Sequence, residues 1–205
     1  MPEFERWFRD DGDSTRLLKH DLNSDSVVFE VGGYLGNFTE KIHNKFDCRV
    51  CVFEPVKDFY TIINDKFKDN DKVSAFNCGL SGENTIVEMN IDKGNGENST
   101  LFERDIIEDL ETEKITLRRI DDIMVENNIK SIDLLNINIE GGEYDFLQYL
   151  VSSPVIYKVK NIQVQFHDFV EKAHTKRSIL QAKLFNTHSP TYNYDFVWEN
   201  WSLRA

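Results

Sequence analysis

The sequence of 205 residues lacks any long apolar run and any excess of positive charge. Its apolar segments fall far short of the ~20 residues that a membrane-spanning helix needs, so no transmembrane segment is predicted. Asp and Glu outnumber Lys and Arg by 36 to 24, giving a formal net charge of −12. Nucleic acids and anionic membranes are bound by clustered Lys and Arg, so this balance argues against both as partners. Two basic pairs, Arg118 with Arg119 and Lys176 with Arg177, are interpreted as solvated faces.

Cysteine is also scarce, which argues against a disulfide framework and fits a reducing compartment. Cys48 and Cys51 have the spacing of a redox or half-zinc motif, but no second pair follows. They lead into an apolar run in which alternation puts the two thiols on opposite faces of a strand. We therefore predict buried structural cysteines. The N-terminus lacks the basic-then-apolar order of a signal peptide, and the expected location is cytoplasmic.

Strand-like apolar runs alternate with helical periodicity along the chain, which predicts an α/β fold with a parallel sheet covered by helices. We expect one domain over residues 1–205, with an N-terminal helical segment at 1–25 and a core at 26–205 that closes with a pair of strands. A turn is predicted at 77–84, a possible edge strand at 85–91 and a loop at 92–100. Further strands are predicted at 26–31, 49–55, 72–77 and 113–120 and within 131–151 and 159–169, and helices near 37–46, 56–70, 121–128 and 170–188.

The first predicted strand ends in Glu30 and is followed by the turn "GGYLG" and a helix. Gly32, Gly33 and Gly36 allow the backbone to approach a ligand closely. A phosphate placed against Glu30 would meet a like charge, whereas S-adenosylmethionine carries a sulfonium and an ammonium. The pattern therefore favours S-adenosylmethionine over a dinucleotide; an ordinary turn with an exposed Glu is the alternative.

Glu54 ends the second predicted strand, 18 residues after Gly36. A carboxylate there can accept hydrogen bonds from both ribose hydroxyls of an adenosine, in NAD as well as in S-adenosylmethionine. A capping Glu before Pro55 is the alternative. After the third strand, backbone groups at Gly79, Leu80 and Ser81 are placed to contact the adenine edge.

Polar residues recur in "DLLNINIEGGEYDFL", where a period of two places Asn136, Asn138 and Glu140 on one side of a buried strand. Such residues are costly to bury unless they reach partners or a ligand. We expect Asn138 to contact the cofactor and Glu140 to serve catalysis. Glu143, in the first turn of the next helix, is a further catalytic candidate, although a carboxylate is stabilised at a helix N-terminus in any case.

His167 ends another predicted parallel strand and points to the same rim. A neutral imidazole can take a proton from a hydroxyl, so His167 is the candidate general base. Glu140, Glu143, His167 and Asp168 also offer ligands for a divalent ion. We do not favour this alternative, and no metal is predicted.

The chain resembles the FkbM-type S-adenosylmethionine-dependent methyltransferases. The resemblance rests on "VVFEVGGYLGNFT", "VFEP", "NCGLSGEN", "NSTL", "ITLRRIDDIM", "IDLLNINIEGGEYDFL" and "FVWENWSLR", in this order over residues 26–204. It implies a Rossmann-like class I methyltransferase fold with a seven-stranded sheet, and O-methylation of a sugar, glycan or related small molecule. It further implies that Glu30, Gly32 and Gly36 hold the methionine part and Glu54 the ribose, and that residues 98–100 (Asn-Ser-Thr) cover the cofactor. Glu140 and Glu143 match the family's acidic pair, and His167 and Trp198 shape the acceptor pocket.

The chain departs from the resembled pattern at Asn136 and Asn138, where Lys and Asp are usual, and at Tyr34, where Asn is common. The two amides keep hydrogen bonding but remove a charge pair. A non-catalytic adenosine-binding module is therefore one alternative function. The other is a nicotinamide-dependent oxidoreductase or epimerase on the same fold, against which Glu30 argues.

Overall fold

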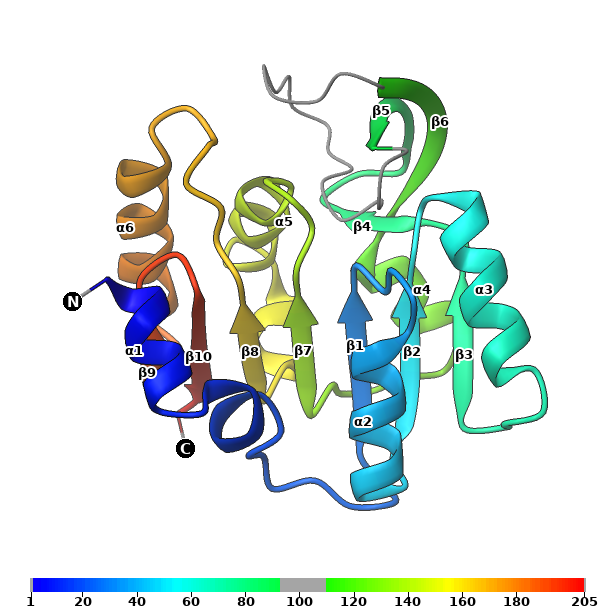
Figure 1. The fold of residues 1–205 in the computed structure, drawn as a ribbon, viewed down its shortest axis with the longest axis horizontal. Helices are drawn as coiled ribbons and strands as arrows, with labels where there is room; N and C mark the ends of the chain where they lie inside the picture. The colour runs from blue at the N-terminus through cyan, green and yellow to red at the C-terminus, as the bar shows by residue number, and fades with distance from the viewer. Residues whose placement is uncertain (1, 93–109, 205) are drawn as a thin grey trace.

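The structure, a computed structural model, describes residues 2–92 and 110–204 (Figure 1). Its centre is a seven-stranded sheet in the order β3-β2-β1-β7-β8-β10-β9. β10 runs antiparallel to both of its neighbours, and the other adjacent pairs are parallel. The strands are β1 (Val27–Val31), β2 (Arg49–Phe53), β3 (Val73–Phe76), β7 (Leu134–Ile137), β8 (Asn161–Val164), β9 (His188–Tyr194) and β10 (Trp198–Leu203).

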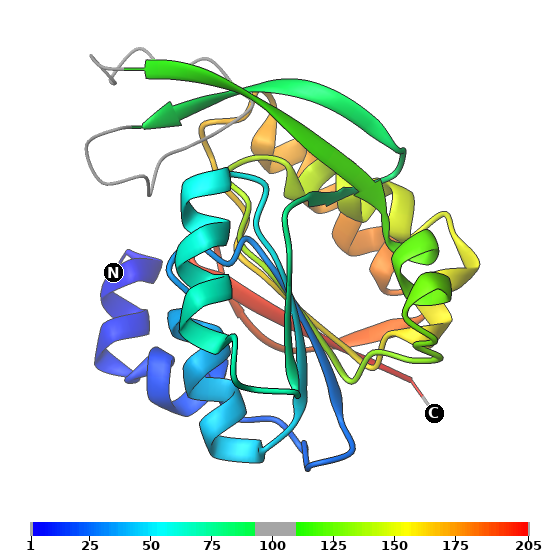
Figure 2. The ribbon, with the colours of Figure 1, turned by 90° about the vertical axis from the view of Figure 1, so that its right-hand side faces the viewer.

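Helices cover both faces of this sheet, as Figure 2 shows, because its central strands are apolar on both sides. α1 (Glu3–Arg9), the π-helical turn η1 (Asp13–Leu17), α2 (Asn37–Phe46) and α3 (Lys57–Phe67) lie on one face. α4 (Ile120–Glu126), α5 (Glu143–Leu150), the 3₁₀ turn η2 (Pro154–Lys158) and α6 (Ala173–Leu184) lie on the other. The expected α/β architecture, mostly parallel with seven strands, is confirmed.

A second sheet of three strands lies above the carboxyl ends of β1 and β2 (Figures 1 and 2). It contains β4 (Gly79–Ser81), β5 (Thr85–Asp92) and β6 (Leu110–Arg119), in the order β4-β6-β5. The turn expected over 77–84 is thus partly a strand, because Gly79 to Ser81 pair with Leu117 to Arg119. The possible edge strand at 85–91 is indeed an edge strand, but of this smaller sheet. Residues 93–100 of the expected loop, with Asn98, Ser99 and Thr100, lie outside the described residues.

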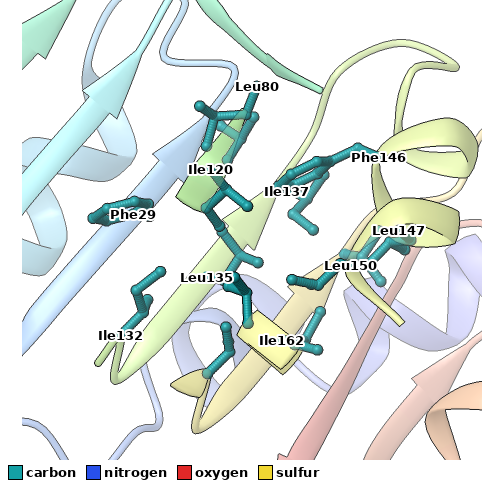
Figure 3. Packing of buried hydrophobic residues seen from close by; sticks show 14 of the residues in the cluster. Phe29, Leu80, Ile120, Ile132, Leu135, Ile137, Phe146, Leu147, Leu150 and Ile162 are labelled. Atoms are coloured by element: carbon teal, nitrogen blue, oxygen red, sulfur yellow. The ribbon is translucent and has the colours of Figure 1, made fainter. Parts of the chain in front are cut away.

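Two apolar clusters, one on each face of the main sheet, hold the layers together. Figure 3 shows part of the larger one, in which Phe29, Leu135 and Ile162 from three strands meet Phe146 and Leu147 of α5. The three cysteines are free and buried, as expected. Cys51 belongs to the larger cluster and Cys48 to the smaller, so the two thiols lie on opposite sides of the sheet.

The C-terminal strand pair begins earlier than the sequence indicated. The helix expected over 170–188 ends at Leu184, and β9 starts at His188. His188 is fully buried, and its Nε2 lies 3.0 Å from the carbonyl oxygen of Val159. This long-range contact fixes the residue as strand. Likewise, the N-terminal segment expected to be helical over 1–25 is helical only in α1 and η1. No helix within the described residues is long and apolar enough to cross a membrane.

Arg177 was interpreted as a solvated residue, and the structure corrects this. Only 7% of it is exposed, and its guanidinium donates to Glu199, which is 2% exposed, at 2.6 Å. It also donates to Asn193 and Asp195. α6 therefore docks on β10 and the β9–β10 turn through a buried ion pair.

We predict that Arg177→Met lowers the free energy of unfolding by about 3–5 kcal/mol, because it leaves Glu199 buried without its cation. Urea denaturation followed by circular dichroism measures the change. Lys172→Met is the control, since the Lys172–Glu171 pair is 73% and 83% exposed and its loss should cost about 0.5 kcal/mol or less. Equal losses in the two variants would contradict a structural role for the buried pair.

Candidate active site

The turn after β1 brings the chain into close contact with the end of β7. Gly32 has φ +91°, and a Cβ there would lie 1.9 Å from the carbonyl oxygen of Asn138. At Gly33 a Cβ would lie 2.4 Å from a methyl group of Val52. Gly36, with φ +70°, starts α2 in a left-handed conformation. A side chain would clash along this path, so glycine lets the turn hold its backbone against the sheet.

Glu30 is 3% exposed, near the end of β1. The hydroxyl of Thr39, in the first turn of α2, donates a short hydrogen bond to its carboxylate. Burial raises the pKa of Glu30 to about 8, and the hydrogen bonds from Thr39 only partly offset this. A buried carboxyl with this pKa is stabilised in its charged form when a cation arrives.

Glu54 directly follows β2 and is 6% exposed. Its two carboxylate oxygens accept hydrogen bonds from the backbone N–H of Tyr34 at 2.8 Å and of Val56 at 2.9 Å. Burial raises its pKa to about 7 despite these bonds. The bond from Tyr34, which has φ +47°, ties the glycine turn to the end of β2. Each oxygen keeps a further lone pair for a ligand donor.

Asn138 supplies an observation that points directly to a ligand. It follows β7, and its backbone N–H donates to Val31 of the neighbouring strand. Its side-chain Oδ1 is buried and has no hydrogen-bond partner among the described residues. A buried acceptor without a donor is rare in folded proteins. Asn138, Glu30 and Glu54 lie at the carboxyl ends of the neighbouring strands β7, β1 and β2, and neither carboxylate has an ion pair within the described residues.

Gly79, Leu80 and Ser81 lie in β4, next to the chain that leaves β3. One edge of β4 pairs with β6, and the other is the outer edge of the small sheet. Asn77 anchors this segment to the end of β2 by donating to the carbonyl oxygens of Glu54 and Pro55. The predicted adenine-contacting segment is thereby attached to the residue predicted to hold the ribose.

The second half of the site consists of Glu140, His167 and Glu143. His167 Nε2 lies 3.0 Å from Glu140 Oε1, and Nδ1 lies 3.1 Å from Glu143 Oε1. Glu143 is fully buried and also accepts from the backbone N–H of His167 and of Gly141. Glu140 has φ +47° and Gly141 has φ +101°, so a left-handed turn directs the two carboxylates to the same imidazole. Strain of this kind in a non-glycine residue is characteristic of functional sites.

The charge of His167 follows from these two neighbours. Burial lowers its pKa, but the hydrogen bonds and negative charges of Glu140 and Glu143 outweigh burial and raise the pKa to about 9. The imidazole is therefore protonated at pH 7, and both ring nitrogens donate. We expected a neutral imidazole that acts as a general base. That role does not fit this arrangement, because a protonated ring has no lone pair to accept a proton.

Several partners in this region were not predicted from the sequence. The side-chain amide of Gln163, in β8, donates to Asn136 Oδ1 at 2.7 Å. The side-chain oxygen of Gln163 is in turn contacted by His20 and by the hydroxyl of Tyr192. Asn136 is thus part of a buried hydrogen-bond network. The period-two alternation predicted for Asn136, Asn138 and Glu140 does not continue past Ile137, because β7 ends there. The contact residues are 27 to 143 positions apart, so no local pattern could reveal them.

Trp198 is the other residue expected to shape the acceptor pocket. Trp198 starts β10 beside the end of β8, whose last residue, Val164, pairs with Glu199. It therefore lies at the same edge of the sheet as His167.

Among the described residues, no group of three or more His, Cys, Asp or Glu is arranged to hold a metal ion.

Because the pKa of His167 rises on folding, its contribution to stability depends on pH. The imidazole of an unfolded chain has a pKa near 6.5, so this stabilisation is complete below about pH 6 and is lost as pH rises through about 9. We predict that the stability difference between the wild type and His167→Gln shrinks by on the order of 2–3 kcal/mol between pH 6 and pH 10. Glu30 and Glu54 are present in both proteins, so their titration cancels in the stability difference between the wild type and the variant.

Urea denaturation at each pH measures this difference, and NMR titration of the imidazole gives the pKa directly. Glu140→Gln should lower the pKa of His167, since one of its two carboxylate partners loses its charge. A His167 that titrates near pH 6.5 in the wild type would refute the protonated state.

Comparison with known proteins finds a relative in sequence and solved structures that share the fold. Methyltransferase 1 of Beauveria bassiana (strain ARSEF 2860) is 24% identical over 181 residues, which cover 78% of this chain and 72% of that protein. A Clostridium thermocellum protein provisionally named an rRNA methylase superposes with a TM-score of 0.58 at 11% identity, covering 97% of this chain and 96% of the other. SMU.1697c from Streptococcus mutans, solved in complex with SAH, has a TM-score of 0.56 at 8% identity, covering 94% and 97%. These two structures share the fold.

The family described as "Methyltransferase FkbM domain" matches residues 30–188, which include every part of the site from Glu30 to His167. The match extends over more than half of the chain and contains both the glycine turn and the Glu140–Glu143 pair. The chain belongs to the FkbM methyltransferase family.

Proposed function

We propose that the chain transfers a methyl group from S-adenosylmethionine to a hydroxyl oxygen of a sugar, glycan or related small molecule. The observation that carries the proposal is the pair of buried carboxylates, Glu30 and Glu54, for which no ion pair exists among the described residues. In this family of methyltransferases, a cationic adenosine compound supplies the missing positive charge. A dinucleotide would bring negative charge to the same place.

The residues of the first half of the site hold the cofactor. Glu30 and the Oδ1 atom of Asn138 accept from its ammonium group, and Glu54 accepts from the ribose hydroxyls through its remaining lone pairs. The glycine turn permits the close approach, and the edge of β4 at Gly79–Ser81 contacts the adenine. When bound, the cofactor supplies a methyl group activated by a sulfonium. The task left to the protein is mainly to align the attacking oxygen with that methyl group.

Glu140 is the member of the second half that an acceptor can reach. Its side chain is 20% exposed, whereas that of His167 is 10% exposed and that of Glu143 is buried. We assign to Glu140 the role of accepting the hydroxyl proton as the oxygen–methyl bond forms and the methyl–sulfur bond breaks. His167 keeps its own proton and fixes the orientation of Glu140, and Glu143 fixes His167. Trp198 borders the acceptor.

A hydroxylated, uncharged or weakly charged acceptor suits this half of the site. A carboxylate accepts well from a hydroxyl, and the net charge of −12 repels polyanions. The proposal therefore favours sugars over nucleic acids, in agreement with the sequence-based expectation.

We predict that Glu140→Gln lowers kcat by about 10² to 10⁴, because the variant keeps the shape of the side chain but cannot take the proton. Methyl transfer from radiolabelled S-adenosylmethionine to a panel of monosaccharides and oligosaccharides measures the rate. The dissociation constant of S-adenosylhomocysteine should stay within about twofold, since Glu140 does not hold the cofactor in this assignment.

Glu171→Gln is the matched control, because Glu171 is 83% exposed on a surface ion pair. It should leave kcat unchanged. Wild-type turnover in Glu140→Gln would remove Glu140 from the mechanism. Cofactor binding without transfer to any hydroxylated acceptor would instead favour the non-catalytic module, and transfer to a nitrogen acceptor would refute O-methylation.

We also predict that S-adenosylhomocysteine binding releases protons at pH 7. Glu30 and Glu54, with pKa values of about 8 and about 7, are partly protonated without ligand. In the proposed assignment, the ammonium group of the ligand favours the charged form of Glu30, and hydrogen bonds from the ribose hydroxyls favour that of Glu54. Isothermal titration calorimetry in two buffers of different ionisation enthalpy gives the number of protons. Glu30→Gln should release fewer protons than the wild type; equal heats in both buffers for the wild type would contradict the assignment.

A further inference from the structure

A cavity of ≈ 370 Å³ lies between the N-terminal segment and the half of the main sheet formed by β8, β10 and β9. One wall of the cavity is formed by Thr15, Arg16, Lys19, His20 and Asp21, and Asn161, Asn200 and Ser202 lie among the strand residues of the other. All the residues that line it have polar or charged side chains. Such a lining offers hydrogen-bond donors and acceptors to a polar ligand. The volume lies within the ~300–1,000 Å³ range of small-molecule sites.

The cavity is separate from the candidate active site. Asn161 is the first residue of β8, and Ser202 pairs with it near the end of antiparallel β10. The cavity therefore lies toward the amino ends of the parallel strands, whereas Glu54 and Glu140 follow their carboxyl ends. In Figures 1 and 2 the N-terminal segment, in dark blue, lies on the face of the sheet that α2 covers.

Asn200, one of the lining residues, has a buried acceptor without a partner among the described residues. Only 3% of this residue is exposed, and its Nδ2 donates to Thr191 Oγ1 at 2.8 Å. Its Oδ1 is buried and has no hydrogen-bond partner among the described residues. Exchanging the two amide atoms would not solve this, because the amino group would then be the unpaired one. A hydroxyl donor in the cavity is the kind of group that Asn200 needs.

The charge of the lining indicates a second property of the ligand. Arg16, Lys19 and Asp21 all line the cavity, which leaves an excess of one positive charge there in a chain of net charge −12. His20 adds none, since burial lowers its pKa. Lys19 is exposed and has no ion pair within residues 2–92 and 110–204. A single anionic group on the ligand would pair with these two cations.

We infer that this cavity binds a polyol of monosaccharide size that carries one anionic group, with its hydroxyls on Asn200, Asn161 and Ser202 and its anion at Arg16 and Lys19. The anionic group is a carboxylate or a phosphate, since both accept charge-assisted hydrogen bonds from Arg and Lys side chains. The site does not depend on the proposed function, because none of these residues belongs to the cofactor or acceptor region.

Isothermal titration calorimetry of the full chain with glucuronate, glucose 6-phosphate and glucose tests the inference. At least one of the two anionic sugars should bind with a stoichiometry of one, and glucose at least tenfold more weakly. The two anionic sugars together distinguish a carboxylate from a phosphate. No saturable binding of either anionic sugar, or equal binding of glucose, would overturn the inference.

Variants locate the bound sugar. Lys19→Glu should weaken binding of the anionic sugar at least tenfold, whereas Lys130→Glu, an equal charge change at an exposed lysine elsewhere, should not. His167→Gln should leave the affinity unchanged, and the NMR signals of the His20 ring should shift on titration. Loss of binding in His167→Gln, or equal losses in the two lysine variants, would refute the location.

Discussion

Buried negative charge at the carboxyl ends of the parallel strands is the constraint on which the rest of this structure depends. Glu30, Glu54 and Glu143 are each almost inaccessible to solvent. A carboxylate in such a place must receive hydrogen bonds or a counter-charge, or else hold a proton. The chain meets this requirement in two different ways, and the difference divides the site into two halves.

In the half formed by β7, β8 and α5, the chain supplies its own cation. His167 carries a proton between Glu140 and Glu143, and that proton makes the three side chains one rigid unit. In the half formed by β1 and β2, the described residues supply hydroxyl and backbone donors to the two carboxylates, and the pKa values of Glu30 and Glu54 rise because burial outweighs these hydrogen bonds. The first half holds two carboxylates without an ion pair among the described residues, whereas in the second half two carboxylates share one imidazolium, which leaves one negative charge. Under the proposed function, the first half receives the cationic methyl donor and the remaining carboxylate charge faces the hydroxylated acceptor.

Much of this could be predicted from local sequence. Short apolar runs and helical patterns identified the central strands and most helices, because burial on both faces of the sheet selects apolar residues continuously. Glu30 and Glu54 were identifiable since each ends an apolar run before a turn. The small sheet of β4, β5 and β6 was not foreseen, because a three-residue strand such as Gly79–Ser81 is too short to show a period. The early start of β9 depends on a contact between His188 and Val159, which are distant in the chain.

The sequence by itself determined the fold class, the family resemblance and the strand ends at which the site is proposed, since these follow from the order and spacing of residue types along the chain. Only the tertiary structure decided the charge of His167, the network that contains Asn136, and the cavity at Asn200. Each of these depends on which side chains meet across the sheet. A pKa and an unpaired acceptor are properties of a residue's surroundings in space, and residues far apart in the sequence supply those surroundings.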